Sequence, residues 1–182
     1  MASRRTVRIG RLTLGGGAPV ALQSMTSTDP HDADATSAQA VALALAGCDL
    51  VRIAVPDLAS VAVARHVRER LGGVPLVADV HFDHRVAIAV APHVDKVRLN
   101  PGTIRGRGAL AEVAAALRDH GTALRIGANS GSLPAALRTA PGPMAQRLCD
   151  AVAPWVARFE DAGVVDLVVS VKATSTLDTL AA

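Results

Sequence analysis

Aromatic residues are scarce in this sequence: Phe82, Trp155 and Phe159 are the only three among 182 residues, and tyrosine is absent. A protein that stacks the bases of single-stranded nucleic acid needs several aromatic faces, which this chain does not have. Half of the residues are apolar, so the core must consist of Val, Leu, Ile and Ala. Such residues suit helices packed closely on a sheet, and the composition indicates a globular chain rather than a disordered one.

Cysteines and long apolar runs are also few. Cys48 and Cys149 are the only cysteines and have no CxxC spacing, so the sequence predicts no disulfide framework and no metal site of its own. We expect both to be buried free thiols. Because no signal peptide and no apolar run of bilayer length is present, we expect a cytoplasmic protein without a membrane partner.

Charge is nearly balanced, with 19 basic and 16 acidic residues and a formal net charge of +3. Four arginines lie close to the start of the chain, at positions 4, 5, 8 and 11. We interpret this cluster as a solvated N-terminal arm. A nucleic-acid-binding arm would be the alternative, but no other nucleic-acid motif accompanies it, so nucleic acid is not an expected partner.

Extended apolar stretches alternate with helical patterns, as in repeated βαβ units that form a parallel sheet. A glycine-containing segment over residues 4–18 predicts a hairpin-like lead-in. Helices between the strands have the start signals Asp34 and Asp57 and stop signals such as Gly47. No linker or low-complexity tract divides the chain. The predicted strands are residues 21–25, 50–55, 75–81, 96–100, 123–129 and 164–173.

The two faces of these strands differ in polarity. Val51 and Ile53 share one face of the second strand while Arg52 points the other way, and later strands repeat this alternation. Strands of an open doubly wound sheet would be apolar on both faces. An antiparallel sheet with one face exposed to solvent would also show this alternation of polar and apolar residues, but the intervening helices disfavour it. We therefore predict an α/β fold: a TIM-type (β/α) barrel that is incomplete, with about six of the eight βα units.

Four basic side chains of the polar faces, Arg52, Arg98, Arg125 and Lys172, come from four different strands and point to one interior volume. Asp79 is the only carboxylate on these faces and cannot neutralise all four. At a separation of ~4 Å and an effective dielectric constant of ~20, each like-charge pair repels by up to ~4 kcal/mol. The cluster therefore predicts a multiply charged anion such as a diphosphate, which arginine forks and a lysine bind well.

Two loops at the same edge of the sheet support an anion site. Asn100 is followed by Pro101 and Gly102, and residues 127–132 read GANSGS. Small residues allow the backbone amides to approach phosphate oxygens closely. Each loop alone is a weak signal, but together with the four cations they favour phosphate binding.

Asp79, His81 and His84 are the only nearby group that could suggest a metal site. The spacing of the two histidines is loose, and only Asp79 and His81 share a strand face. We therefore predict no metal site. Hydrogen bonding to a substrate, or orientation of a basic side chain, is the expected role of Asp79 and His81.

Six stretches of the chain, in order, resemble the 4-hydroxy-3-methylbut-2-enyl diphosphate synthase family of the non-mevalonate isoprenoid pathway. Together they extend over nearly the whole chain, which makes the resemblance far more specific than any single motif. The stretches are GGAPVALQSMT (16–26), DLVRI (49–53), PLVADVHF (75–82), VRLNPG (97–102), RIGANSGSL (125–133) and VSVKA (169–173).

The resemblance implies an oxidoreductase that opens the ring of 2-C-methyl-D-erythritol 2,4-cyclodiphosphate and expels water. It further implies a [4Fe-4S] cluster on three cysteines of a separate C-terminal domain, and ferredoxin or flavodoxin as electron donor. Asp79 and His81 would be catalytic residues of the pocket. With the loops included, the predicted substrate-binding residues are Arg52, Arg98, Asn100, Arg125, Asn129 and Lys172.

The chain also departs from the family pattern. The family's barrel continues for two more strands, the cluster domain follows, and Cys48 and Cys149 match no cluster ligand. We therefore expect residues 1–182 to be a partial TIM-like, diphosphate-binding domain without the iron–sulfur domain, and inactive in isolation. The chain would be a fragment, a degenerate copy or half of a split enzyme, completed by a homo-oligomer or a separate C-terminal half.

Two other functions remain open from the sequence. The chain could be a non-catalytic barrel remnant that serves as a binding module. It could also be a different TIM-barrel enzyme that acts on a phosphorylated substrate without a redox cofactor. A neighbouring reading frame with the missing cysteines would favour the split enzyme, whereas activity without iron would favour the third interpretation.

Overall fold

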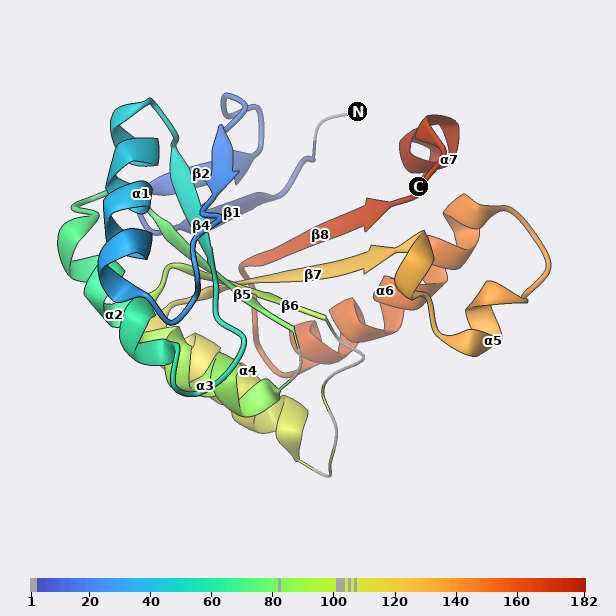
Figure 1. The fold of residues 1–182 in the computed structure, drawn as a ribbon. Coiled ribbons are helices and arrows are strands. Elements are labelled where there is room, and N and C mark those ends of the chain that lie inside the picture. The colour runs from blue at the N-terminus through green and yellow to red at the C-terminus, as the bar shows by residue number, and fades with distance from the viewer. Residues whose placement is uncertain (1–2, 82, 101–103, 105, 107) are drawn as a thin grey trace.

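Six parallel strands form one curled sheet in which neighbours in the chain are also neighbours in space (Figure 1). The computed structural model describes residues 3–81, 83–100, 104, 106 and 108–182. This sheet confirms the predicted strand order and the incomplete TIM-type barrel. The strands are Gln23–Met25 (β3), Leu50–Ala54 (β4), Leu76–Val80 (β5), Lys96–Leu99 (β6), Ala123–Asn129 (β7) and Leu167–Lys172 (β8).

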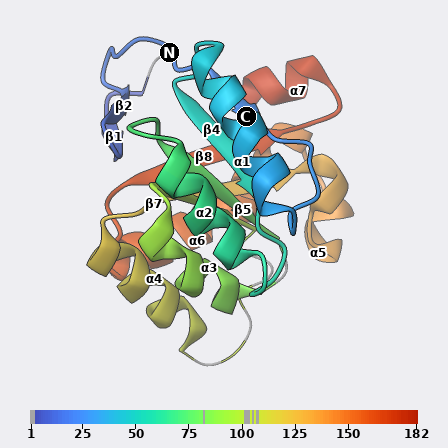
Figure 2. The same ribbon diagram turned by 60° about the vertical axis from the view of Figure 1, so that its left-hand side comes forward.

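Helices cover the outer, convex face of the sheet. Figure 2 shows α1 to α4 next to one another, each in contact with the next or with the strand it covers, while α6 packs on β7 and β8. A short α5 and a terminal α7 lie near the carboxyl ends of β7 and β8. The helices are Ala33–Leu45 (α1), Val61–Arg70 (α2), His84–Val90 (α3), Ala109–His120 (α4), Ala135–Arg138 (α5), Met144–Asp161 (α6) and Thr176–Ala181 (α7).

The core lies between the sheet and these helices. Val51 and Ile53 of β4 are fully buried there, as are the outward-facing residues of β5 and β6 and the inner stripes of α2 and α4. Val169 of the edge strand β8, in contrast, is 49% exposed. The predicted apolar face is therefore fully buried only on the inner strands, since an edge strand is covered on one side alone.

Local helix signals were close to the predicted positions. Asp32, not Asp34, is the N-cap of α1, and its side chain accepts a hydrogen bond from a first-turn amide. Asp57 accepts from the amide of Ser60 and fixes the turn before α2 rather than capping the helix itself. Gly47 follows the end of α1 with φ +100°, as a C-terminal stop requires.

The N-terminal arginines are exposed, as expected of a solvated segment, but they belong to a folded hairpin rather than to a free arm. Strands β1 (Thr6–Ile9) and β2 (Leu12–Gly15) pair antiparallel and confirm the predicted hairpin. The guanidinium of Arg5 lies 2.5 Å from Glu160 of α6, and the amide of Arg8 donates to Asp166 before β8. Ile9 is fully buried. The hairpin thus covers the amino end of the sheet.

The hairpin turn packs closely against the start of β6. Gly10 has φ +55°, and a Cβ atom there would lie 2.6 Å from Oδ1 of Asp95. Asp95 cannot move away easily, because its other oxygen is bound by Arg68 and by the amide of Leu76. Only glycine therefore fits at this turn, for both conformational and steric reasons.

Replacing Gly10 with alanine should lower the free energy of unfolding by roughly 2–4 kcal/mol, through left-handed strain and the clash with Asp95. Gly17 is the matched control, since it also has positive φ but open space around it. Gly17→Ala should cost only the strain, about 1–2 kcal/mol. Urea denaturation measures both values, and equal losses would contradict a close contact between the hairpin and β6.

Candidate anion-binding site

The inward-facing charged residues lie on neighbouring strands at nearly the same level. Asp79 of β5, Arg98 of β6 and Arg125 of β7 are direct neighbours in the parallel register. Arg52 of β4 lies beside the same space. Its neighbour in register is Val77, which lies two residues before Asp79 on the same face of β5. Strand alternation alone brings these side chains together, as the sequence predicted.

Asp79 is the centre of this cluster. Its side chain is only 5% exposed and forms ion pairs with Arg52 and with Arg98, the latter at 3.2 Å from Nη1 to Oδ1. Burial by itself would raise the pKa of Asp79, but the charges of Arg52 and Arg98 and the hydrogen bonds from Arg52 and His81 hold it below the usual value. Asp79 is therefore ionised at neutral pH and fixes two guanidinium groups.

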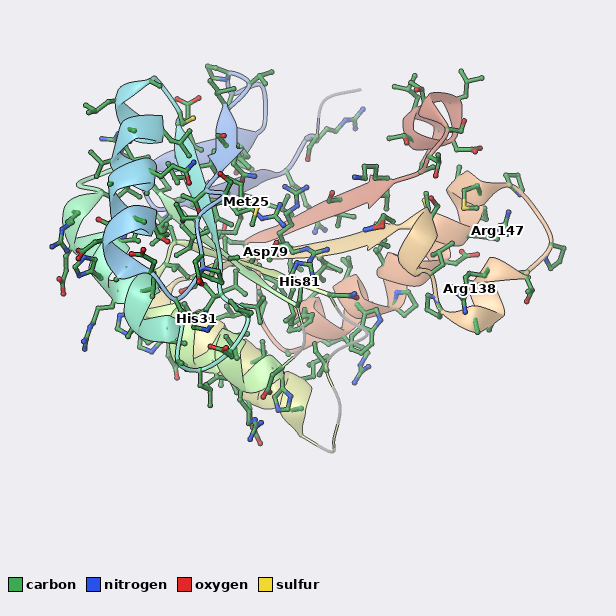
Figure 3. All side chains as sticks on the ribbon, viewed as in Figure 1. Met25, His31, Asp79, His81, Arg138 and Arg147 are labelled. Atoms are coloured by element: carbon green, nitrogen blue, oxygen red, sulfur yellow. The ribbon has the colours of Figure 1, made fainter. Side chains whose placement is uncertain are left out.

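His81 lies at the rim of the cluster with a half-exposed side chain. Its Nε2 is 3.0 Å from Oδ2 of Asp79 and 3.1 Å from Nη1 of Arg98. Figure 3 shows Asp79 and His81 together over the middle of the sheet, whereas Arg138 and Arg147 lie apart from them near α5 and α6. The imidazole is thus oriented by the buried carboxylate while it remains open to solvent.

A cavity of about 230 Å³ opens beside these residues, between β4 and β8. Arg125 donates to Oγ of Ser170 at 2.7 Å, and burial together with the charges of Arg52 and Arg98 lowers the pKa of its guanidinium. Lys172 is exposed at the mouth. The cavity is lined by Arg52, Arg98, Arg125, Gly127, Ala128, Asn129, Ser170 and Lys172.

Both predicted asparagines lie at carboxyl ends of strands. Asn129 ends β7, is the neighbour of Lys172 in register and lines the cavity. Asn100 follows β6 directly and is half-buried, but it is not among the described residues that line the cavity. Of the loop behind it, Pro101 and Gly102 lie outside the described residues. Of the stretch 127–132, the cavity is lined by Gly127, Ala128 and Asn129, which are the last three residues of β7.

Two polar residues at the site were not among the predicted site residues. Ser170 accepts a hydrogen bond from Arg125. A polar residue between apolar neighbours on β8 was the sequence feature that could have identified Ser170 as a site residue. Lys96 begins β6 two residues before Arg98, so it shares the inward face, yet it is only 2% exposed. Burial, together with the charges of Arg125 and Arg52, lowers the pKa of Lys96 to about 8.

Within residues 3–81, 83–100, 104, 106 and 108–182, no three His, Cys, Asp or Glu side chains lie close enough to hold a metal ion. Cys48 lies just before β4 and is half-buried, and Cys149 lies on α6 with its Sγ 3.5 Å from the carbonyl oxygen of Ala182. Neither cysteine lines the cavity. In the same part of the chain, no helix is both long and apolar enough to span a membrane.

Comparison with known proteins places this geometry in a family. The sequence profile of the GcpE TIM-barrel domain matches residues 4–182. The chain belongs to the GcpE TIM-barrel domain family. A likeness in fold extends further: a type I 3-dehydroquinate dehydratase from Clostridium difficile superimposes with a TM-score of 0.67 at 16% identity, over 97% of this chain and 72% of that one.

Another structure, a truncated 3-deoxy-D-arabino-heptulosonate 7-phosphate synthase from Thermotoga maritima, superimposes on this GcpE-type domain with a TM-score of 0.61 at 12% identity. The superposition covers 92% of this chain and 56% of the other. At such low identities these two structures support the fold alone.

Curated relatives of this GcpE-type domain carry the name 4-hydroxy-3-methylbut-2-en-1-yl diphosphate synthase (flavodoxin). The protein from Symbiobacterium thermophilum is 40% identical over 93% of this chain and 46% of its own length. The protein from Acinetobacter baumannii strain ATCC 17978 is 41% identical over 97% of this chain and 48% of its own. The chain thus spans about half the length of the curated relatives it matches.

Asp79→Asn should lower the free energy of unfolding by roughly 3 kcal/mol at pH 7, because it leaves the guanidinium groups of Arg52 and Arg98 without their shared counter-charge. Asp119→Asn, on the exposed end of α4, is the control and should cost less than about 0.5 kcal/mol. Urea denaturation of both variants and the wild type gives these values.

The effect of Asp79→Asn should also depend on pH. Because the folded-state pKa of Asp79 lies below its unfolded value, its stabilisation is complete above about pH 4 and is lost as the pH falls through the folded pKa. The difference between wild type and variant should therefore shrink below about pH 4. A difference that is constant between pH 7 and pH 3 would exclude Asp79 as the ionised centre of the cluster.

Proposed function

We propose that this domain is the substrate-binding barrel of a 4-hydroxy-3-methylbut-2-en-1-yl diphosphate synthase. In this function the cavity between β4 and β8 holds the diphosphate of 2-C-methyl-D-erythritol 2,4-cyclodiphosphate, whose ring is opened reductively with loss of water. The names of the curated relatives support the reaction, and the residues of the cavity support the binding of the anion.

Charge balance inside the cavity is the observation that carries this proposal. Three arginines and Lys172 line the cavity, and the ion pairs with Asp79 engage only Arg52 and Arg98. Arg125 is held by the uncharged Ser170. Buried cations without a full set of counter-ions are costly, and a bound diphosphate supplies the missing charge in the bidentate geometry that guanidinium groups prefer.

Asp79 and His81 take different roles in this proposal. Asp79 is a positioning residue, since it is ionised and buried and forms ion pairs with two arginines. These ion pairs orient the two guanidinium groups toward the cavity. His81 is the candidate catalytic residue, because its half-exposed imidazole can exchange a proton with a substrate hydroxyl while Asp79 orients it. Asn100 and Asn129 would hydrogen-bond to the substrate from the ends of β6 and β7.

The cysteines of this chain do not fit the [4Fe-4S] cluster that the family resemblance implies. Three thiolates at one place are needed, but the two cysteines are Cys48, just before β4, and Cys149 on α6, and neither lines the cavity. No step of the reaction is therefore assigned to a cluster on this chain. The relatives' name indicates flavodoxin as electron donor, and we extend this to a ferredoxin or flavodoxin for the complete enzyme.

Assembly and location belong to the same proposal. We assign residues 1–182 to one partial, diphosphate-binding barrel domain of an enzyme whose iron–sulfur part lies outside these residues, in a C-terminal half, and we propose that the barrel also forms a homo-oligomer. The unpaired edges of β3 and β8 support such a completion, since open sheet edges favour pairing with another strand. A cytoplasmic location is part of the proposal as well.

Pyrophosphate should bind to the purified chain, and Arg125→Ala or Lys172→Ala should each weaken binding about tenfold to a hundredfold, since each removes one charge-assisted contact worth ~1.5–3 kcal/mol. These two side chains form no ion pair among the described residues, so their removal disturbs the fold least. Calorimetric titration with pyrophosphate and with the cyclodiphosphate measures the affinities.

Arg65→Ala is the matched control, because Arg65 is exposed on α2, outside the half-barrel. Its affinity should equal that of the wild type. If Arg65→Ala and Arg125→Ala weaken binding equally, the anion binds through general surface charge, and the cavity is not the substrate site.

A further inference from the structure

The chain uses lysine at only two positions, Lys96 and Lys172, and arginine at every other basic position. Both lysines lie on the inward face of the half-barrel, Lys96 at the start of β6 and Lys172 at the end of β8. Guanidinium groups keep their proton under all physiological conditions, whereas a lysine can lose its charge when it is buried. Of the two, only Lys96 is buried.

Lys96 is enclosed from every side. It is flanked in register by Val77 of β5 and Ala123 of β7. Among the described residues, its Nζ contacts the carboxamide oxygen of Gln23 on β3, at 3.4 Å, and no other hydrogen-bond acceptor. Below it, the N-terminal hairpin closes the amino end of the sheet, with Gly10 packed against the residue that precedes Lys96. Water therefore has little access to this ammonium group.

The charges that face Lys96 are mostly positive. Arg52 of β4 and Arg125 of β7 both repel its ammonium group, and Arg98 follows two residues later on the same face. Gln23 of β3 is uncharged, and Lys172 of β8 lies further up at the mouth.

Carboxylates near Lys96 are already engaged elsewhere. Asp79 of β5 is shared by Arg52, Arg98 and His81, and Asp95 is paired with Arg68. Among the described residues, no carboxylate forms an ion pair with Lys96. Burial, Arg125 and Arg52 together bring its pKa down to about 8, so a substantial fraction of Lys96 is neutral in mildly alkaline solution.

We propose that Lys96 is the floor of the anion site and takes up a proton from solvent when a multiply charged anion binds to the arginines and Lys172 above it. This inference rests on the proposed function, since it needs an anion in the cavity. The bound anion cancels the positive field of Arg52 and Arg125, and this field is part of what keeps the proton off Lys96. Anion binding and protonation of Lys96 are therefore mutually favourable.

The sign of the pH dependence follows from this linkage. Well below pH 8, Lys96 is charged with or without the anion, and binding takes up no proton there. Above the free pKa, binding must bring a proton, so the affinity falls as the pH rises, about tenfold for each unit by which the anion raises the pKa. With a one-unit rise, uptake reaches about half a proton near pH 8.5.

Lysine-specific NMR tests the proposal directly, because a sample labelled with ¹³C at Cε of lysine gives only two side-chain signals. The signals are titrated from pH 6 to pH 11 with and without saturating pyrophosphate, and Lys96→Met assigns them. We expect the free midpoint of Lys96 near pH 8 to rise by about one unit or more with pyrophosphate. A midpoint that does not move, or one near the ordinary lysine value in the free chain, overturns the proposal.

Affinity measurements with variants give a second readout that a merely structural role would not move. Lys96→Met, which conserves length without charge, should bind pyrophosphate about tenfold more weakly than wild type at pH 7 and equally well at pH 10. Lys96→Arg should change in affinity between these pH values only as much as the Met variant does, because that change reports the ionisation of pyrophosphate itself. A loss that is the same at both pH values would show that Lys96 only supports the fold.

The outcomes separate this inference from the proposed function. If pyrophosphate binds with the expected dependence on Arg125 and the Lys96 midpoint stays constant, the anion site stands and the coupling is wrong. If pyrophosphate does not bind at all, both are wrong.

Discussion

A single buried carboxylate, Asp79, holds the inner surface of this half-barrel together. It accepts hydrogen bonds from arginines on the strands to either side, so β4, β5 and β6 are tied to one another at the level where the cavity begins. Without this carboxylate, the two guanidinium groups would repel each other at close range. The same ion pairs aim the remaining donors of Arg52 and Arg98 at the cavity, so stability and ligand binding depend on the same contacts.

The alternation of polar and apolar residues was enough to predict the sheet, its parallel order and the convergence of Arg52, Arg98 and Arg125. These follow from the two-residue period of a strand and from the short right-handed connections of βα units. How the charges share partners was not predictable. That Asp79 takes two arginines and Ser170 takes the third depends on strand register and side-chain rotamers, which no local pattern specifies.

The N-terminal arginines are a second case in which the local sequence was not enough to predict the contacts. Composition near the chain start predicted their exposure to solvent, but not the contacts of the Arg5 side chain with Glu160 and of the Arg8 amide with Asp166, which join residues far apart in the sequence. Lys96 was overlooked as a site residue for a related reason. Its place on the inward face could be read from the sequence, but its burial among residues from distant parts of the chain could not.

The near-absence of lysine has a practical consequence for chemical labelling. Apart from the α-amino group, the chain offers reagents only two primary amines, and Lys96 is enclosed while Lys172 is exposed at the mouth of the cavity. Amine-directed probes, which attach at many surface positions of most proteins, would attach on this chain mainly at the α-amino group and at Lys172 beside the anion site. A fluorophore or cross-linker could thus be placed at the mouth without any engineered cysteine.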